Sequence, residues 1–401
     1  MKIGHKMMNH IRKRYASPLL LKKLKFSPVV LIQGPRQTGK SFLVKNLLPE
    51  RIQKEYKTLD LASVKNFAAN NPDSFIRDRE AGIVLIIDEA QKVPLLFDSV
   101  KAAVDEDRQP GQFILLGSTE FSKLNNIRES LTGRATRLKV FPLTLSEVKH
   151  LDLNNSKNYC NEKPRVARTD LLKYLKNGGM PGLFGIKNEA EKFNALKDWI
   201  DLTAQRDATN FKNVKVDSDL IIRIMSSIAI LEDTSLGAIS KHLRVDIRKI
   251  KTHMNVLSTL FVVNKIDPYP TSTGKTQYFL CDVGFLSYFQ GSFEKKLKTW
   301  LIQEFTAQLS YLEQDLKKLY FYRSPKGSII DLIICKNEVV EFCIKLFPEE
   351  KTQSKQYELL RSFKIKNSDY FSETAKLIAL TGTLIKLKDD DVFIYPWESI
   401  A

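Results

Sequence analysis

The sequence predicts an α/β fold with a parallel sheet and helices on both faces, and three stretches carry this prediction. An apolar, β-branched run over residues 29–33 leads into a loop with the GxxxxGK[ST] spacing, and a segment of helical period over residues 42–48 follows at once. Two later runs, residues 83–87 and 113–116, are aliphatic or aromatic throughout, which is typical of strands buried on both faces. Helical stretches over residues 62–79 and 95–105 separate the strands, with one further strand expected over residues 56–60.

The loop after the first strand has the composition of a phosphate loop. Gly34 and Gly39 permit backbone angles and close approach that a Cβ would obstruct, so successive N–H groups can converge on phosphate oxygens. Lys40 supplies a mobile positive charge, and the Ser41 hydroxyl is placed to bind the accompanying Mg²⁺. The alternative is a glycine-rich turn beside a solvated lysine. The expected nucleotide-binding residues are Gly34, Pro35, Arg36, Gln37, Thr38, Gly39, Lys40, Ser41 and Phe42.

Polar residues follow the two later buried strands. Asp88 and Glu89 close the run over residues 83–87, at the end of a parallel strand where ligands bind. We expect Asp88 to hold Mg²⁺ and Glu89 to polarise the attacking water, although a solvated acidic turn has the same composition. The strand over residues 113–116 ends near Ser118 and Thr119, and either hydroxyl is a candidate for contact with the γ-phosphate or the water.

Composition places limits on the class of protein. The 401 residues are 43% hydrophobic and 27% charged, ordinary values for a globular chain expected to hold two or three domains. No apolar run approaches the length of a membrane span, and the apolar residues 19–21 are interrupted too early for a signal peptide, so we expect a cytoplasmic protein. The net charge of +17 suggests a polyanionic partner such as DNA, or simply lysine-rich solvated helices. The four cysteines lack metal-binding spacing.

We expect four regions, with limits at residues 1–150, 151–215, 216–290 and 291–401. The second is a helical lid or linker. The third has helices over residues 220–231, 236–243 and 247–257, followed by strands over 262–266 and 277–280, the order of a winged-helix domain. Its third helix carries Arg248, Lys249 and Lys251, which are candidates for DNA contact. Packing against another domain is the competing explanation, because the helix lacks a clear set of base-reading side chains.

Several motifs together resemble a known family. GPRQTGKS, LIIDEAQKVP, FILLGSTEF and SLTGRATRLKVFPLTLSE occur in this order, and YLKNGGMPG and QRD follow in the second half. In this the chain is similar to AAA+-type prokaryotic ATPases, with an ATPase domain of the AAA_14 kind and a DUF4143-like C-terminal region. The resemblance implies ATP as the nucleotide, with Lys40, Asp88 and Ser118 on adjacent strands. It also implies Arg134 as an arginine finger reaching a neighbouring subunit of a homo-oligomer; a salt bridge on a surface helix is the alternative for Arg134.

The same resemblance implies a restriction-endonuclease-like fold, of the PD-(D/E)XK type, for residues 291–401. Its metal site would need an acid on a helix near Glu304, then Asp331 and a Glu-x-Lys pair ending at Lys345. Cys343 stands where the second acid belongs, and a thiol is a poor ligand for Mg²⁺. We therefore expect a degenerate, vestigial nuclease site at Glu304, Asp331 and Lys345.

The leading hypothesis is an Mg²⁺-dependent ATPase whose nucleotide state is coupled to a winged-helix and nuclease-like C-terminal half that acts on DNA. The predicted catalytic residues are Lys40, Glu89, Ser118 and Arg134. Two alternatives remain at this point. One is a nucleotide-controlled module that binds DNA or protein with negligible hydrolysis, and the other is an ATP-gated nuclease.

Overall fold

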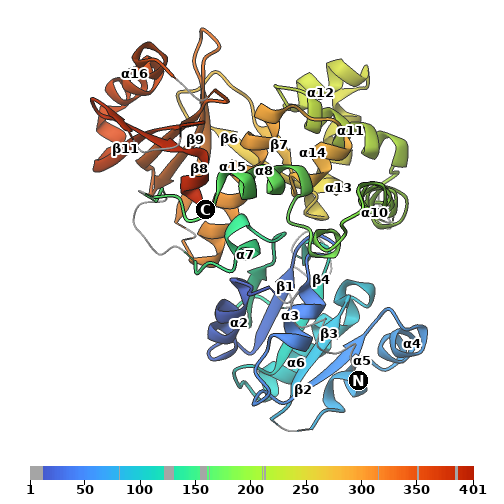
Figure 1. Cartoon of the computed structure of the whole chain (residues 1–401). Coiled ribbons are helices and arrows are strands. Elements are labelled where there is room, and N and C mark those ends of the chain that lie inside the picture. The colour runs from blue at the N-terminus through green and yellow to red at the C-terminus, as the bar shows by residue number, and fades with distance from the viewer. Residues whose placement is uncertain are drawn as a thin grey trace. The chain divides into compact units, whose positions relative to one another are not determined.

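The computed structural model describes residues 12–80, 82–121, 131–153, 160–161, 163–209, 211, 214–314, 316–349, 352–383 and 387–401 (Figure 1). The chain forms two compact units. Unit 1 comprises Met1–Pro142 with Thr259–Val262, and unit 2 comprises Leu143–Ser258 with Val263–Ala401. Residues 1–11 and residues 154–159, the latter in the predicted lid or linker region, lie outside the described ranges. Among the described helices, none combines the length and apolar character needed to cross a bilayer.

Unit 1 is built on a five-stranded parallel sheet in the order β2-β3-β4-β1-β5. The three central strands are buried at every position, which is why they read as unbroken apolar runs. The two edge strands are only partly buried and are rich in polar and charged residues. The strands are β1 Val29–Gln33, β2 Lys54–Thr58, β3 Val84–Asp88, β4 Phe113–Gly117 and β5 Ala135–Lys139.

Helices cover both faces of this sheet, as predicted. On one face Leu31, Leu85 and Phe113 pack in a single core cluster with apolar side chains of α4, α5 and α6. On the other face α2 contacts β1 and β5. The expected helix over residues 62–79 is two helices, because Pro72 cannot continue α4 and instead starts α5. The helices are α2 Ala16–Leu24, α3 Lys40–Asn46, α4 Ala62–Asn70, α5 Pro72–Arg77 and α6 Leu95–Glu106.

Unit 2 contains an eight-stranded mixed sheet in the order β12-β13-β11-β10-β9-β8-β6-β7. Helix α15 packs in one core cluster with residues of β9 and β10, and α16 packs in a second cluster with residues of β9, β10 and β11. The strands are β6 Val263–Pro268, β7 Gln277–Leu280, β8 Lys317–Arg323, β9 Ile329–Lys336, β10 Val339–Leu346, β11 Phe371–Thr381, β12 Leu387–Asp389 and β13 Val392–Pro396.

The helices of unit 2 precede, interrupt and follow this sheet in the chain. The longer ones are α8 Arg168–Asn177, α10 Glu189–Leu202, α11 Ser218–Ile230, α12 Leu236–Leu243, α13 Ile247–Thr259, α15 Phe293–Tyr311 and α16 Glu358–Lys366. The shorter ones are α7 Leu145–Val148, α9 Pro181–Phe184 and α14 Gly284–Tyr288, with a π-helical turn Thr203–Asp207 after α10.

The three helices and two strands expected over residues 220–280 are present as α11, α12, α13, β6 and β7. They do not form a separate unit, however. Strand β6 pairs antiparallel with β7 and also parallel with β8, so the hairpin is the edge of the large sheet. The first limit between the two units lies after residue 142, and the predicted limits at residues 215 and 290 fall within unit 2, where they stay predictions.

Candidate nucleotide-binding site

The phosphate loop lies between β1 and α3, and its close packing against the chain after β5 requires a glycine. A Cβ on Gly34 would lie 2.1 Å from the Val140 carbonyl oxygen, and Val140 N–H donates to the Gln33 carbonyl at 2.7 Å. Gly39 has φ 88°, in the left-handed region that glycine favours, and directly precedes the first turn of α3. The loop is therefore held against the end of β5 by contacts that exclude other residues at position 34.

Lys40 is buried beneath this loop. Its Nζ donates to the carbonyl oxygens of Gly34 at 2.9 Å and Pro35 at 2.7 Å, so the loop curls around the ammonium group. The Thr38 hydroxyl donates to the same Pro35 carbonyl at 2.9 Å. The other predicted loop residues are less enclosed: Gln37 and Phe42 are exposed, and Arg36 and Ser41 are half-buried.

Arg14 supports the loop from the N-terminal segment. Its guanidinium donates to the Thr38 carbonyl and to the Phe141 carbonyl, each at 2.7 Å. The side chain is 7% exposed. The sequence did not predict this contact, because Arg14 is 24 positions from Thr38 and no pattern distinguishes it from the other basic residues near the N-terminus.

Asp88 and Ser41 form the part of the site suited to a magnesium ion. The Ser41 hydroxyl donates to Asp88 Oδ2 at 2.5 Å, and Glu89 N–H donates to Oδ1 at 2.9 Å. Tyr56, on the neighbouring strand β2, donates its hydroxyl to the same Oδ2. Burial and the nearby Asp88 carboxylate raise the pKa of Tyr56 well above its ordinary value. Hydroxyl and carboxylate oxygens are the hard ligands that Mg²⁺ prefers, so the donor set fits that ion.

Glu89 lies against Gln91 and Ser118, which come from two different strand ends. Gln91 donates its side-chain amide to Glu89 Oε2 and, at 3.3 Å, to Ser118 Oγ; the Ser118 hydroxyl in turn lies 3.4 Å from Glu89 Oε2. Burial raises the pKa of Glu89, while the Lys40 charge opposes that rise. The arrangement brings Ser118 to the predicted water-activating carboxylate. Thr119 contributes its carbonyl instead, accepting from the Gln33 side chain at 2.8 Å.

Arg134 lies at the amino-terminal ends of the strands, whereas the phosphate loop lies at their carboxyl ends. Its carbonyl accepts from Val29 N–H at 3.3 Å, and β5 begins beside the first residue of β1, whereas the loop follows the last. That separation is roughly 15 Å along the strands. The exposed guanidinium forms a bidentate ion pair with Asp105, at 2.5 and 2.8 Å. Arg134 is thus remote from the nucleotide site of its own chain, and only contact with another subunit's nucleotide fits the predicted role.

Each of the predicted nuclease residues bonds to partners outside the predicted set. Glu304 is fully buried and accepts from Leu145 N–H and Gln308, each at 3.1 Å. Asp331 accepts from Leu346 N–H at 2.8 Å, and Lys345 donates to the Ile329 carbonyl at 2.7 Å. In the part of the chain that the structure describes, no group of three or more His, Cys, Asp or Glu side chains could hold a metal ion.

Cys343 and the neighbours of Glu304 belong to different core clusters. Cys343 belongs to the cluster under α16, whereas the α15 neighbours of Glu304 pack in the other cluster. Burial raises the pKa of Glu304 to about 7, which favours a neutral carboxyl over a metal-binding carboxylate near neutral pH. The expectation of a vestigial metal site at Glu304, Asp331 and Lys345 is therefore not supported by the geometry.

The candidate DNA-contacting residues Arg248, Lys249 and Lys251 are all exposed on α13. Lys249 forms an ion pair with Asp217 at 3.0 Å. His253, one turn further along, is buried; its Nε2 accepts from Asp217 N–H at 2.9 Å and so caps the chain entering α11. The exposed face of α13 is therefore basic, but His253 lies on the buried face and has a structural role.

Two family matches cover most of the chain. Residues 26–149 match the family described as AAA domain, and residues 168–296 match a domain of unknown function, DUF8612. The first match spans the five-stranded sheet and the phosphate loop. The second differs from the DUF4143-like region that the sequence motifs implied.

Two relatives and one solved structure share 15–24% sequence identity with this chain. The uncharacterised protein Rv2008c of Mycobacterium tuberculosis is 24% identical in an alignment of 352 residues that covers 81% of this chain and 71% of the relative. The uncharacterised protein MJ1544 of Methanocaldococcus jannaschii is 23% identical over 225 residues, 51% of this chain and 48% of the relative. The Walker-type ATPase PABY2304 of Pyrococcus abyssi aligns with a TM-score of 0.42 and 15% identity, over 69% of this chain and 94% of that one.

Proposed function

We propose that the AAA-type P-loop domain of residues 26–149 binds Mg·ATP and hydrolyses it, and that the nucleotide state is coupled to unit 2, which acts on DNA. One observation supports the enzymatic part above all others. Lys40, Ser41, Asp88, Glu89 and Ser118, from three separate segments, lie together at the carboxyl ends of β1, β3 and β4. This is the edge of a parallel sheet at which ligands bind.

The phosphate-binding residues divide the work between charge and hydrogen bonding. On nucleotide binding, Lys40 exchanges its contacts with the Gly34 and Pro35 carbonyls for phosphate oxygens, and the loop amides and the N-terminus of α3 donate to the same group. Ser41 and Asp88 would hold the magnesium ion, which supplies positive charge against the β- and γ-phosphate oxygens. Tyr56 keeps the Asp88 carboxylate in place through its hydrogen bond.

Glu89 is the proposed general base. Its carboxylate accepts the proton of the attacking water, and Gln91 and Ser118 fix its orientation from two sides. Partial burial raises its pKa, which makes it a better proton acceptor, while Lys40 keeps the charged form populated. ATP is proposed as the substrate from the family match and not from a base-reading contact.

Turnover measurements test the enzymatic part of this proposal. Lys40→Ala should lose ATP binding, and Glu89→Gln should retain binding but lose hydrolysis by about a hundredfold or more, because a positioned base contributes 10²–10⁴-fold. Glu50→Gln is the matched control, since Glu50 is an exposed acid outside the site. Each protein is assayed for phosphate release and for nucleotide affinity, with and without DNA. Undiminished hydrolysis by Glu89→Gln would show that another group activates the water.

A further inference from the structure

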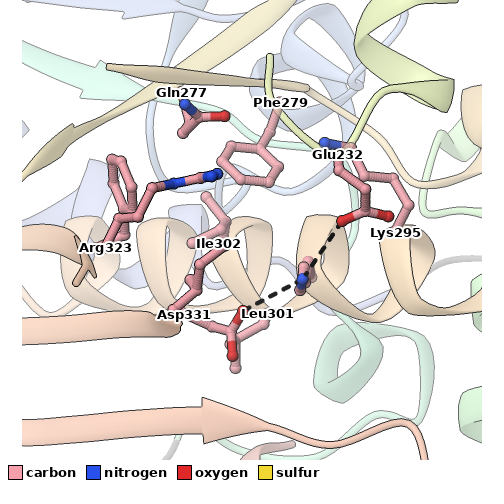
Figure 2. A pocket seen from close by; sticks show the side chains of 11 residues that line it. Glu232, Gln277, Phe279, Lys295, Leu301, Ile302, Arg323 and Asp331 are labelled. Atoms are coloured by element: carbon pink, nitrogen blue, oxygen red, sulfur yellow. Dashed lines mark ion pairs between the residues drawn. The ribbon is translucent and has the colours of Figure 1, made fainter. Parts of the chain in front are cut away.

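A pocket in unit 2 presents cations that the nucleotide site does not use. It lies between α15 and the strands β7, β8 and β9, with about 40 Å³ of cavity (Figure 2). By the volume that one water needs, this space holds about three or four water-sized groups, and the oxygens of one phosphate are of that number. The apolar part of the wall is Phe279, Leu301, Ile302, Phe321 and Ile329, and the polar part is Glu232, Gln277, Lys295, Lys298, Arg323 and Asp331.

One of the three cations is already neutralised by neighbouring acids. Lys298 Nζ lies 2.6 Å from Glu294, 3.6 Å from Asp331 and 3.8 Å from Glu232. Figure 2 shows two of these ion pairs as dashed lines across the floor of the pocket. Gln277 is also fully engaged, since its amide bonds to Thr234, Asp233 and the Lys275 carbonyl. Neither side chain has spare capacity for a ligand.

Lys295 is different. Its side chain is 3% exposed, and its Nζ lies 5.0 Å from the centre of the Phe279 ring. Among the described residues no carboxylate lies within ion-pair distance of it; Glu232, Asp233 and Glu294 act only at longer range. Burial lowers the pKa of Lys295 to about 8, although these acids oppose the shift and Lys298 adds to it. An ammonium buried without a carboxylate partner costs stability, so binding an anion beside Lys295 would stabilise the folded protein.

Arg323 completes the arrangement from the other side. It is the last residue of β8 and half-buried, and its guanidinium makes no hydrogen bond or ion pair with the described residues. In Figure 2 the Arg323 side chain extends toward the Phe279 ring from the side opposite Lys295. A guanidinium offers paired N–H donors and an ammonium adds a compact charge, a combination suited to an oxyanion.

We propose that this pocket binds one phosphate group, held by Lys295 and Arg323 over the Phe279 ring. The group is either free inorganic phosphate or the terminal phosphate of a nucleotide or oligonucleotide, because the cavity admits the head group and opens to solvent beyond it. The site is separate from the phosphate loop and independent of the proposed hydrolysis.

Phosphate titration of the full chain tests this proposal. Lys40→Ala serves as the parent, so that the phosphate loop does not contribute, and binding of inorganic phosphate is followed by calorimetry. Adding Arg323→Ala or Lys295→Met should weaken phosphate binding at least tenfold. Lys318→Ala is the matched control, because Lys318 lies on the same strand but is exposed and outside the pocket. It should leave the affinity unchanged.

Two further arms identify the source and exclude a purely structural role. Binding of a 5′-phosphorylated tetranucleotide is compared with binding of its unphosphorylated form and of inorganic phosphate. Tighter binding of inorganic phosphate, or of the phosphorylated over the unphosphorylated tetranucleotide, supports the site and identifies the source of the phosphate. Lys295→Met should also raise the melting temperature in phosphate-free buffer, because it removes a buried charge. The proposal is overturned if phosphate does not bind the parent, if the pocket variants bind it as well as the control, or if acetate binds equally.

Discussion

At the scale of single residues, Asp88, the proposed metal-binding acid, is held by contacts from three segments. Tyr56, Ser41 and the Glu89 amide all donate to Asp88, and each removes one way in which the carboxylate could turn. Such supporting hydrogen bonds affect metal affinity nearly as strongly as the ligands themselves. Gln91 likewise donates a hydrogen bond to the Glu89 carboxylate and restricts its rotation.

Tyr56→Phe should therefore raise the Mg²⁺ concentration needed for half-maximal ATP turnover by about tenfold, while nucleotide binding without metal stays the same. The ring remains, so the contact of Lys45 with its face should persist. Tyr370→Phe, on an exposed tyrosine of unit 2, controls for the loss of a hydroxyl. An unchanged magnesium titration would show that Tyr56 does not orient the metal site.

Glu304 makes a second residue-scale prediction, on stability. Its folded pKa of about 7 lies above the usual 4.5, so the folded state holds its proton over a pH range in which the unfolded state has released it. Stability relative to Glu304→Gln should then fall as pH rises from about 4.5 to 7, by about 3 kcal/mol in total, and level off above that. Chemical unfolding at several pH values measures the difference. Asp282, with a pKa raised to about 6, titrates in both proteins and cancels. A difference independent of pH would contradict the buried, protonated carboxyl.

At the scale of elements, α13 presents exposed cations on a helix whose other side is core. Ile250, Met254 and Leu257 are buried at the spacing of one helical face, so the opposite face must meet solvent or a partner. Because Lys249 is paired with Asp217, the cations Arg248 and Lys251 are the better test of DNA contact.

We expect the affinity of the protein for duplex DNA to fall steeply with salt, and the double variant Arg248→Ala, Lys251→Ala to reduce the slope of log affinity against log salt by about two. Each lost phosphate contact removes about 0.9 from that slope. Lys336→Ala, an exposed lysine at the end of β9, is the control. Equal slopes for the double variant and the parent would remove α13 from DNA binding.

At the scale of the whole molecule, the predicted arginine-finger role of Arg134 requires a second copy of the chain. Arg134 lies at the end of the strands that is opposite to its own phosphate loop, and it forms an ion pair with Asp105. In trans, an arginine finger contributes about 10³-fold or more to turnover. We expect Arg134→Ala to lose most ATP hydrolysis while retaining its affinity for ATP. Asp105→Ala, which releases the arginine from its ion pair, should retain hydrolysis.

Turnover per chain should also rise with protein concentration as subunits assemble. Sedimentation with bound ATP and a dilution series of the activity measure both effects. A protein that stays monomeric with ATP and hydrolyses it at full rate would assign Arg134 to the surface ion pair alone.

The sequence by itself determined the centre of unit 1. The phosphate loop, the buried strands β1, β3 and β4, and the acids closing β3 are local patterns, because a strand buried on both faces must be apolar throughout and a phosphate loop needs its glycines in place. The helix and strand order of residues 220–280 was likewise readable from periodicity.

Only the tertiary structure decided which distant residues complete the site. Arg14, Tyr56 and Gln91 contact the site through hydrogen bonds that no local sequence pattern predicts. Edge strand β5 was not predicted, because the solvent-exposed side of the strand interrupts its apolar pattern. For the nuclease prediction the relation is the converse: Cys343 stands where the pattern along the chain needs an acid, and packing places it in a different core from the α15 neighbours of Glu304. Spacing along a chain constrains what one element presents, whereas a site built from several elements depends on how their faces pack.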